Sequence, residues 1–175
     1  MSRWLIDPDH TVATFTVRHM MIADVHGHFN RIAGELLYAP DDPAVTALEA
    51  IIEAEGICTG IAKRDEHLRS ADFFDVPRFP HITFKSTSVA LEGADLRRMR
   101  GQLALRGVTR LVELEVERFG PLTAHDGDTS IGLRLSTRIN REDYGMSWNV
   151  PLVGGLMVGV EVRIVIDLEA DLAEV

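Results

Sequence analysis

The stretch VGVEVRIVIDLEA at residues 158–170 alternates between apolar and polar side chains over almost its whole length. Its apolar positions form one series, which consists of Val158, Val160, Val162, Ile164, Ile166 and Leu168. The positions between them carry charge at Glu161, Arg163, Asp167 and Glu169. Successive side chains of an extended strand point to opposite faces, so this pattern predicts a strand with one buried face and one face in water.

The same period of two recurs along the chain and predicts about seven more strands. They are expected at residues 11–21, 25–38, 48–56, 81–89, 98–106, 112–117 and 131–139. The period slips in the second of these, near Asn30 and Arg31, which indicates a bulge or a bend. Consecutive strands with short turns favour an antiparallel meander, and closing such a sheet removes its exposed edges. We therefore expect an all-β fold, an eight-stranded antiparallel up-and-down barrel of the lipocalin-like kind, as a single domain over residues 1–175.

The segment TGIAKRDEHLRSADFFDVPRFP at residues 59–80 breaks this alternation. It predicts a short helical insert between the third and fourth strands, supported by Asp65 and Arg69 at positions i and i+4. One interpretation is a cap over an end of the barrel, with Phe73 and Phe74 turned inward. The alternative is an acid–base cluster of Arg64, Asp65, His67 and Asp72. No nucleophile elbow, metalloprotease, P-loop or dinucleotide motif accompanies these residues, which favours the cap.

Composition limits the classes of function. The chain has 175 residues, 46% hydrophobic content and a formal net charge of −9, so nucleic acid or an anionic bilayer surface would repel it. Cys58 is the single cysteine, which excludes an internal disulfide. No run approaches the roughly 20 apolar residues of a membrane span, and the first residues lack the apolar stretch of a signal peptide. We expect a cytoplasmic protein with no membrane span.

The inward faces of the predicted strands decide the function. They combine modest aliphatic side chains with the small residues Ala13, Ala50, Ala54 and Gly101, and the whole chain is only 6% aromatic. Small residues on an inner wall leave volume, and apolar volume binds apolar chains. An eight-stranded barrel either holds a small ligand or is filled by its own side chains, so a packed scaffold that binds nothing is the alternative. Polar contacts to a ligand head group are expected from His19, His67 or Arg64.

A second hypothesis is a metal-dependent enzyme. His26 and His28 stand at i and i+2 of a predicted strand, which places both imidazoles on one face, as in some strand-borne metal sites. His19 or Glu35 would supply the third ligand. The alternative is an exposed polar face on a bent strand. Short motifs of this kind often arise without function, so we expect neither a bound metal nor a cofactor.

Five segments of the chain resemble the YceI-like family of lipocalin-like proteins. They are IDPDHTVATFTVRH at residues 6–19, TGIAKRDEHLRSADFFDVPRFPHITFKST at 59–87, GQLALRGVTRLVELEVERFG at 101–120, INREDYG at 139–145 and MVGVEVRIVIDLEA at 157–170. These motifs are long, follow the order of the family, and extend over nearly the whole chain.

This resemblance implies an eight-stranded barrel with a lengthwise hydrophobic tunnel, in a protein that is not an enzyme. Family members are described as binding polyisoprenoids, isoprenoid quinones or other long-chain amphiphiles, often as homodimers. No catalytic residue is established in the family, so none is transferred to this chain. The predicted ligand-binding residues line the tunnel, cap it or stand at its mouth, and they are Phe15, Val17, His19, Phe73, Phe74, Phe84, Leu103, Leu105, Leu114, Leu133 and Ile164.

Overall fold

A computed structural model describes residues 1–93, 95–125 and 127–173. Its main sheet has ten strands, which are β1 (Ser2–Ile6), β2 (Val12–His19), β3 (Ala23–Phe29), β4 (Ile32–Tyr38), β5 (Ala47–Glu53), β6 (His81–Glu92), β7 (Asp95–Leu105), β8 (Val108–Thr123), β9 (Thr129–Asn140) and β12 (Val158–Leu172). The other elements are α1 (Ala62–Arg69), the short 3-10 turns η1 (Pro43–Val45), η2 (Ala54–Gly56) and η3 (Arg141–Tyr144), and the hairpin of β10 (Pro151–Leu152) and β11 (Gly155–Leu156). Within the described ranges, no helix has the length and apolar character needed to cross a membrane.

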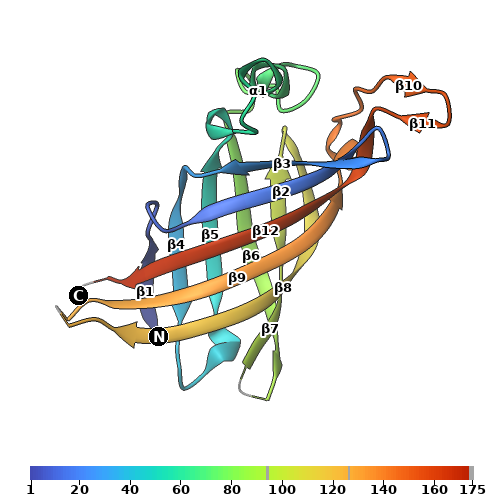
Figure 1. Cartoon of the computed structure of the whole chain (residues 1–175). Helices are drawn as coiled ribbons and strands as arrows, with labels where there is room; N and C mark the ends of the chain where they lie inside the picture. The colour runs from blue at the N-terminus through green and yellow to red at the C-terminus, as the bar shows by residue number, and fades with distance from the viewer. Residues whose placement is uncertain (94, 126, 174–175) are drawn as a thin grey trace.

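The sheet closes on itself through β12 (Figure 1). Along one edge β12 pairs with β9, and along the other edge it pairs with β2 and then, near its C-terminal end, with β1. Because β3 pairs with β2 and β4 pairs with β1, β1 and β2 share one position in the wall and β3 and β4 share the next. The wall therefore has eight antiparallel positions, and the predicted all-β eight-stranded antiparallel barrel is confirmed.

The predicted place of the helical insert in the strand order was wrong. Helix α1 follows β5, the fifth strand, rather than the third. The sequence pattern missed β1, because its five residues are followed at once by bends at residues 8–10 and give too short an alternation to count. The single strand expected at residues 25–38 is two strands, β3 and β4, which are separated at Asn30 and Arg31, where the period slips.

Both chain ends lie towards one end of the barrel (Figure 1), and this half has a core of large buried side chains. Trp4 of β1 pairs in register with Leu36 of β4 and Leu172 of β12. Further core residues of this half are less than a tenth exposed, and they include Tyr38, Leu96, Met99, Val116, Ile131 and Leu133. Full burial of a large apolar side chain contributes roughly 1.5–3 kcal/mol. This half therefore supplies a stable base for the opposite, capped half.

Candidate functional site

The capped half of the barrel is hollow. It contains a partly open cavity of about 160 Å³, to which β2, β5, β6, β7, β8, β9 and β12 all contribute inward-facing side chains. The lining is apolar apart from Thr14, Thr83, Thr137 and Arg141. Cavities with such walls stay dry and accept apolar groups rather than water. The alternation in the sequence thus produces a packed core at one end of the barrel and a cavity at the other.

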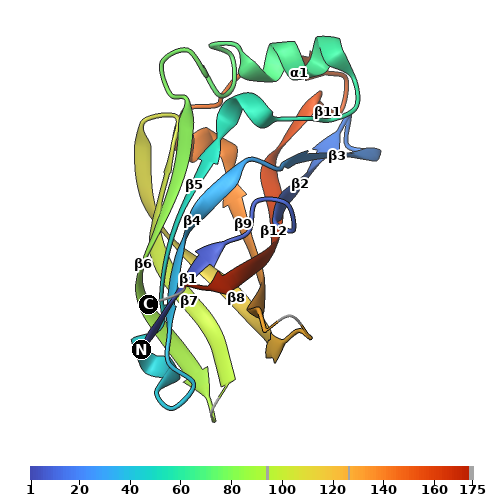
Figure 2. The ribbon, with the colours of Figure 1, turned by 90° about the vertical axis from the view of Figure 1, so that its left-hand side faces the viewer.

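The insert closes the end of the barrel opposite to the chain ends (Figure 2). Asp65 of α1 accepts hydrogen bonds from the Thr59 hydroxyl and, at 2.8 Å, from the Thr59 backbone N–H. Arg64 Nε donates to Thr59 Oγ1 at 2.7 Å. These bonds hold α1 against the loop that leads into it. After α1 the chain turns back over the barrel, and Phe73 and Phe74 enter the cavity lining.

A series of aromatic rings links the cap to the wall of the cavity. The centroids of the Phe15 and Phe29 rings lie 5.8 Å apart, and those of Phe29 and Phe74 lie 5.5 Å apart in an edge-to-face arrangement. Such pairs contribute about 0.5–1.5 kcal/mol beyond the area that they bury. Phe74 is therefore held in place by β2 and β3 as well as by its own loop.

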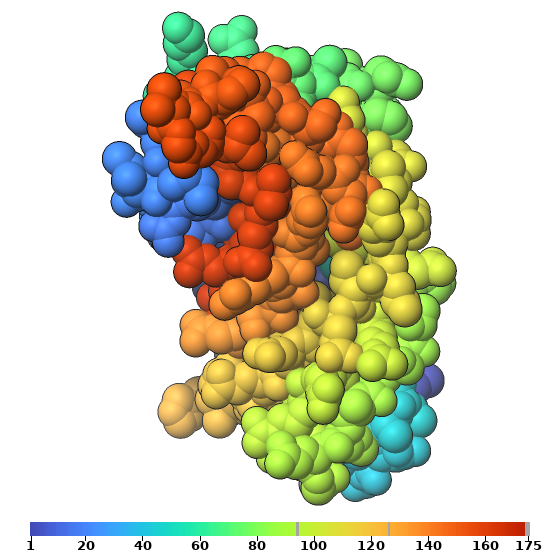
Figure 3. All heavy atoms as spheres, turned by 90° about the vertical axis from the view of Figure 1, so that its right-hand side faces the viewer, coloured from blue at the N-terminus to red at the C-terminus, as the bar shows by residue number. Residues whose placement is uncertain are grey.

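A second group of rings joins the insert to the segment between β9 and β12. The insert and this segment lie together at the closed end of the barrel in Figure 3. The His67 ring stands nearly perpendicular to Trp148, with centroids 4.7 Å apart, and Phe73 lies 5.4 Å from Trp148. His67 Nε2 and Asp72 Oδ2 form a hydrogen bond of 2.8 Å. His67 and Asp72 thus form one pair, while the other charged residues considered for an acid–base cluster bind the Thr59 loop. The four residues therefore form two separate contacts, one within the Thr59 loop and one between His67 and Asp72, rather than a single acid–base cluster.

Two glycines make room for aromatic rings. A Cβ atom on Gly27 would lie 2.2 Å from the Phe15 ring, and one on Gly101 would lie 2.4 Å from the Phe84 ring. The small residue at position 101 was expected to leave empty volume in the barrel. The Phe84 ring occupies that space instead, because it lies directly against the backbone of the neighbouring strand.

The wall between β8 and β9 is loosely joined near the capped end. The two strands pair from Glu115 and Ser136 towards the end that holds the chain termini. Beyond this pair, the Thr137 hydroxyl donates to the Glu113 carbonyl oxygen at 2.8 Å. Val112 of β8 and Ile139 of β9 line the cavity on the two sides of this seam. The seam is thus a place where the barrel wall borders the cavity without a continuous ladder of backbone hydrogen bonds.

Arg141 is the charged residue of the cavity lining, and it is only 3% exposed. Its Nε donates to the Gly159 carbonyl oxygen at 2.8 Å, and its Nη1 donates to the carbonyls of Met146 and Trp148. Its Nη2 donates to the Val158 carbonyl oxygen at 3.3 Å. Burial lowers the pKa of Arg141, with a smaller opposing effect from the charge of the neighbouring glutamate. The side chain thereby holds the irregular segment after η3 against the start of β12.

The YceI-like domain family matches residues 4–170. The chain belongs to the YceI-like family. Among its relatives, the UPF0312 protein of Enterobacter sp. (strain 638) is 33% identical over 138 residues, which are 79% of this chain and 71% of that protein.

Solved structures agree with this YceI-like barrel over nearly its whole length. BcnA of Burkholderia cenocepacia is similar with a TM-score of 0.82 at 18% identity, over 94% of this chain and 98% of that chain. A polyisoprenoid binding domain from Saccharophagus degradans, implicated in plant cell wall breakdown, is similar with a TM-score of 0.72 at 15% identity, over 99% of this chain and 100% of that chain. At these identities the likeness shows a common fold.

Most of the predicted ligand-binding residues line the cavity of this YceI-like barrel, namely Phe15, Val17, Phe73, Phe74, Phe84, Leu103, Leu105, Leu114 and Ile164. Leu133 is outside the lining, since it is buried in the packed half. His19 is also outside the lining and ends β2, where it pairs with Ala23. A period of two shows which face of a strand is inward, but not how far the cavity extends along the barrel. The role of these residues in binding stays a prediction.

Sequence reasoning missed several lining residues of the YceI-like cavity. Phe29 lies at the end of β3, where the slip in period hid its face. Arg141 and Met146 lie in or after η3, in a segment without alternation. Only the INREDYG motif marked this segment, and it marked the family rather than a position in the cavity.

The metal hypothesis finds no support in the described part of the YceI-like chain. His26 and His28 share the face of β3 opposite to the buried Gly27, and His26 Nδ1 lies 3.1 Å from Thr16 Oγ1. Within the described ranges, neither imidazole belongs to a group of three metal-ligating side chains. The proposed third ligands, His19 and Glu35, do not join them.

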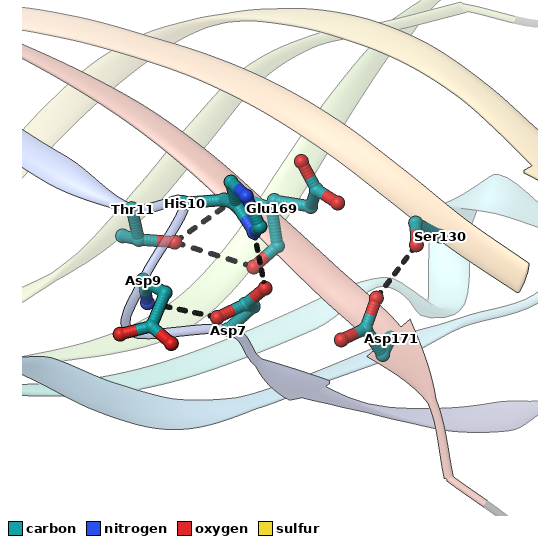
Figure 4. Close-up of polar contacts among 7 residues, drawn as sticks. All are labelled: Asp7, Asp9, His10, Thr11, Ser130, Glu169 and Asp171. Carbon is teal, nitrogen blue, oxygen red and sulfur yellow. Dashed lines mark hydrogen bonds and ion pairs between the residues drawn. The ribbon is translucent and has the colours of Figure 1, made fainter. Parts of the chain in front are cut away.

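Another group of three possible ligands lies on the side of the barrel (Figure 4). It consists of Asp7, His10 and Glu169, whose candidate atoms all lie within 4.8 Å of one another. His10 Nδ1 and Asp7 Oδ2 share a hydrogen bond of 2.6 Å, and the Glu169 backbone N–H donates to Thr11 Oγ1 at 3.1 Å. The hydrogen bond between them raises the pKa of His10 and lowers the pKa of Asp7. These contacts attach the β1–β2 connection to β12. The cluster therefore has a structural role.

Proposed function

We propose that this YceI-like protein is a non-enzymatic carrier that holds the apolar chain of an amphiphile in the barrel cavity. The observation that carries the proposal is the cavity inside the barrel, which is partly open and has an almost entirely apolar lining. Burial of the chain supplies the driving force, at about 0.8 kcal/mol for each CH₂ group. This gain must exceed the cost of ordering the ligand, which favours long chains over short ones.

We further propose a polyisoprenoid, an isoprenoid quinone or a similar lipid as the ligand. Membership of the YceI-like family and the likeness to the polyisoprenoid binding domain of Saccharophagus degradans support this choice. The cavity of about 160 Å³ is close in size to an engineered cavity of about 150 Å³ that holds benzene. A longer chain therefore requires the lining side chains to move apart. Family resemblance also leads us to propose a homodimer, which light scattering would test.

Native mass spectrometry of the purified protein, followed by organic extraction, tests the carrier proposal directly. We expect a co-purified species with the mass of a lipid or quinone. Protein without such a species is then titrated with geranylgeraniol and with a long-chain ubiquinone, using displacement of a fluorescent apolar probe as the readout. A protein that carries nothing and binds neither ligand would show that the barrel is a scaffold.

A pair of variants on one strand shows whether the ligand occupies the cavity. Leu103 lines the cavity and its neighbour Gln102 faces outward on β7. Leu103→Trp fills the cavity, so we expect at least a tenfold loss of affinity for the probe. Gln102→Trp adds the same side chain to the outer face and should leave affinity unchanged. Equal affinities for both variants would place the ligand elsewhere on the protein.

A further inference from the structure

Arg141 brings a positive charge into a wall that is otherwise uncharged. It is 3% exposed, and the remainder of the cavity lining consists of apolar residues and threonines. No acidic side chain of the described chain lies within ion-pair distance of its guanidinium. Buried charges in proteins are normally paired, because an isolated charge loses its hydration without compensation. The carbonyl groups around Arg141 solvate the charge but do not neutralise it, and the charge of Glu142 acts on it without forming an ion pair.

The hydrogen bonds of Arg141 leave donor capacity unused. A guanidinium carries five N–H donors. One donor on Nε, two on Nη1 and one on Nη2 bind the carbonyls of Gly159, Met146, Trp148 and Val158. One Nη2 donor is left without a partner within the described ranges. The guanidinium also lies 5.9 Å from the centre of the Phe73 ring, which lines the same capped end.

A ligand with a negative charge would complete this arrangement. A carboxylate or phosphate oxygen beside Nη2 would accept the unused donor in a charge-assisted hydrogen bond, which is stronger than a neutral one. It would also neutralise the buried charge in a site with mostly apolar walls, where electrostatic attraction is strong. A neutral hydroxyl or ester would accept the hydrogen bond but leave the charge uncompensated.

We propose that Arg141 is the head-group site of the cavity and that it selects amphiphiles with an anionic head, a carboxylate or a phosphate. The chain of the ligand then extends along the cavity from the capped end towards the packed half. This proposal rests on the proposed function, since it specifies the polar end of the same ligand. Of the residues suggested from the sequence for this role, Arg64 binds Thr59 and His67 binds Asp72. The third, His19, lies outside the cavity lining at the end of β2.

Matched ligand pairs test the proposal on the unaltered protein. Hexadecanoate is compared with hexadecanol, and farnesyl phosphate with farnesol, by displacement of the same apolar probe near pH 8. We expect the anion to bind at least tenfold more tightly than its alcohol in one or both pairs. Selection in the first pair points to fatty acids, and selection in the second points to prenyl phosphates. If alcohols bind as tightly as anions in both pairs, the head-group proposal is overturned while the carrier function stands.

Variants assign the selection to Arg141. Arg141→Gln should reduce the preference for the anion to less than about threefold and keep the affinity for the alcohol. Arg138→Gln is the control, because Arg138 lies three residues earlier, on β9, and pairs with Glu161 at 3.5 Å on the outer face. A preference that survives in folded Arg141→Gln would overturn the assignment. If circular dichroism shows that Arg141→Gln does not fold, Arg141→Lys keeps the charge without the fork and should retain part of the preference. Binding of neither alcohol nor anion to the unaltered protein would instead overturn the proposed function.

Discussion

Gly27 of β3 lies beneath the Phe15 ring, and Gly101 of β7 lies beneath the Phe84 ring. The three atoms nearest to a Cβ atom on Gly27 would all belong to the Phe15 ring, whereas a Cβ atom on Gly101 would also lie 2.6 Å from the Lys85 carbonyl oxygen. In Gly27→Ala the ring turns into the cavity, so we expect a several-fold loss of ligand affinity with little loss of stability. In Gly101→Ala the backbone must shift as well, which should lower the free energy of unfolding by about 1–3 kcal/mol.

Urea denaturation and probe titration of both variants distinguish these effects. A Gly27→Ala protein that binds the probe as tightly as the unaltered chain would contradict the first expectation. An equal loss of stability in the two variants would contradict the second.

The Asp7–His10 hydrogen bond makes stability depend on pH. It raises the pKa of His10 above 6.5 and lowers the pKa of Asp7 below 3.8. The histidine contribution is full below about pH 6.5 and is lost as pH rises through its folded pKa, while the carboxyl contribution is lost as pH falls through the lowered pKa of Asp7. The pair therefore stabilises the fold most between about pH 4 and pH 6.5. Asp7→Asn should thus lower the free energy of unfolding more at about pH 5.5 than at about pH 8.5.

NMR titration gives a direct readout of the same pair. In Asp7→Asn the pKa of His10 should fall towards its ordinary value, because the largest cause of its rise is removed, while the smaller effects of Glu169 and Asp9 remain. In the control Asp9→Asn it should stay raised. A pKa of His10 that is the same in the unaltered protein and in Asp7→Asn would show that the hydrogen bond has no effect in solution.

At the scale of elements, the attachment of α1 depends on Asp65. This carboxylate is buried, and its loss would leave the Thr59 N–H and hydroxyl without their acceptor. An unsatisfied buried polar group costs about 1–3 kcal/mol. We expect Asp65→Ala to speed hydrogen exchange of the α1 amides and the release of ligand, with little change in β9 and β12. Glu66→Ala, at an exposed position of the same helix, is the control, and faster exchange throughout the barrel would show that the cap is part of the global fold.

The strands of the barrel were predictable because a half-buried strand leaves a period of two in the sequence. The series that contains Ile164 identified β12 and its inward face, and the slip at Asn30 located the break between β3 and β4. The pattern did not detect β1, which is too short. It also did not place Arg141 in the cavity, because Arg141 belongs to a 3-10 turn, which has no period of two. The hydrogen bonds of its side chain go to carbonyl groups that are distant in sequence or lie in an irregular segment. The local sequence pattern thus predicts the strands of the barrel wall. The polar part of the site depends on tertiary contacts, which the pattern does not contain.

The whole molecule combines a packed half and a hollow half in one sheet. Large side chains such as Trp4, Tyr38 and Met99 fill the end with the chain termini, while the capped end keeps its cavity. An empty apolar cavity costs stability, because its lining atoms lose contacts. The packed half offsets this cost and at the same time forms the floor against which a bound chain must stop.

This floor predicts how affinity depends on chain length. Along a series of fatty acids, each CH₂ that enters the cavity adds about 0.8 kcal/mol, or roughly a fourfold gain in affinity. Leu135 and Leu168 line the cavity. Leu133 lies directly beside them, because it is two residues from Leu135 on β9 and pairs with Leu168. The gain should therefore stop when the chain reaches Leu133. Leu133→Ala extends the space, so the plateau should move to longer chains.

The test measures affinity for acids of increasing length on the unaltered protein, on Leu133→Ala and on the control Ile51→Ala, whose side chain is on the outer face. Leu133→Ala should also lose about 2–5 kcal/mol of stability, so binding is measured well below its unfolding temperature. A plateau that stays at the same length in Leu133→Ala would place the floor elsewhere. Affinity that rises without a plateau in the unaltered protein would mean that the chain passes through the packed half, and the core around Trp4 would then have to open when ligand binds.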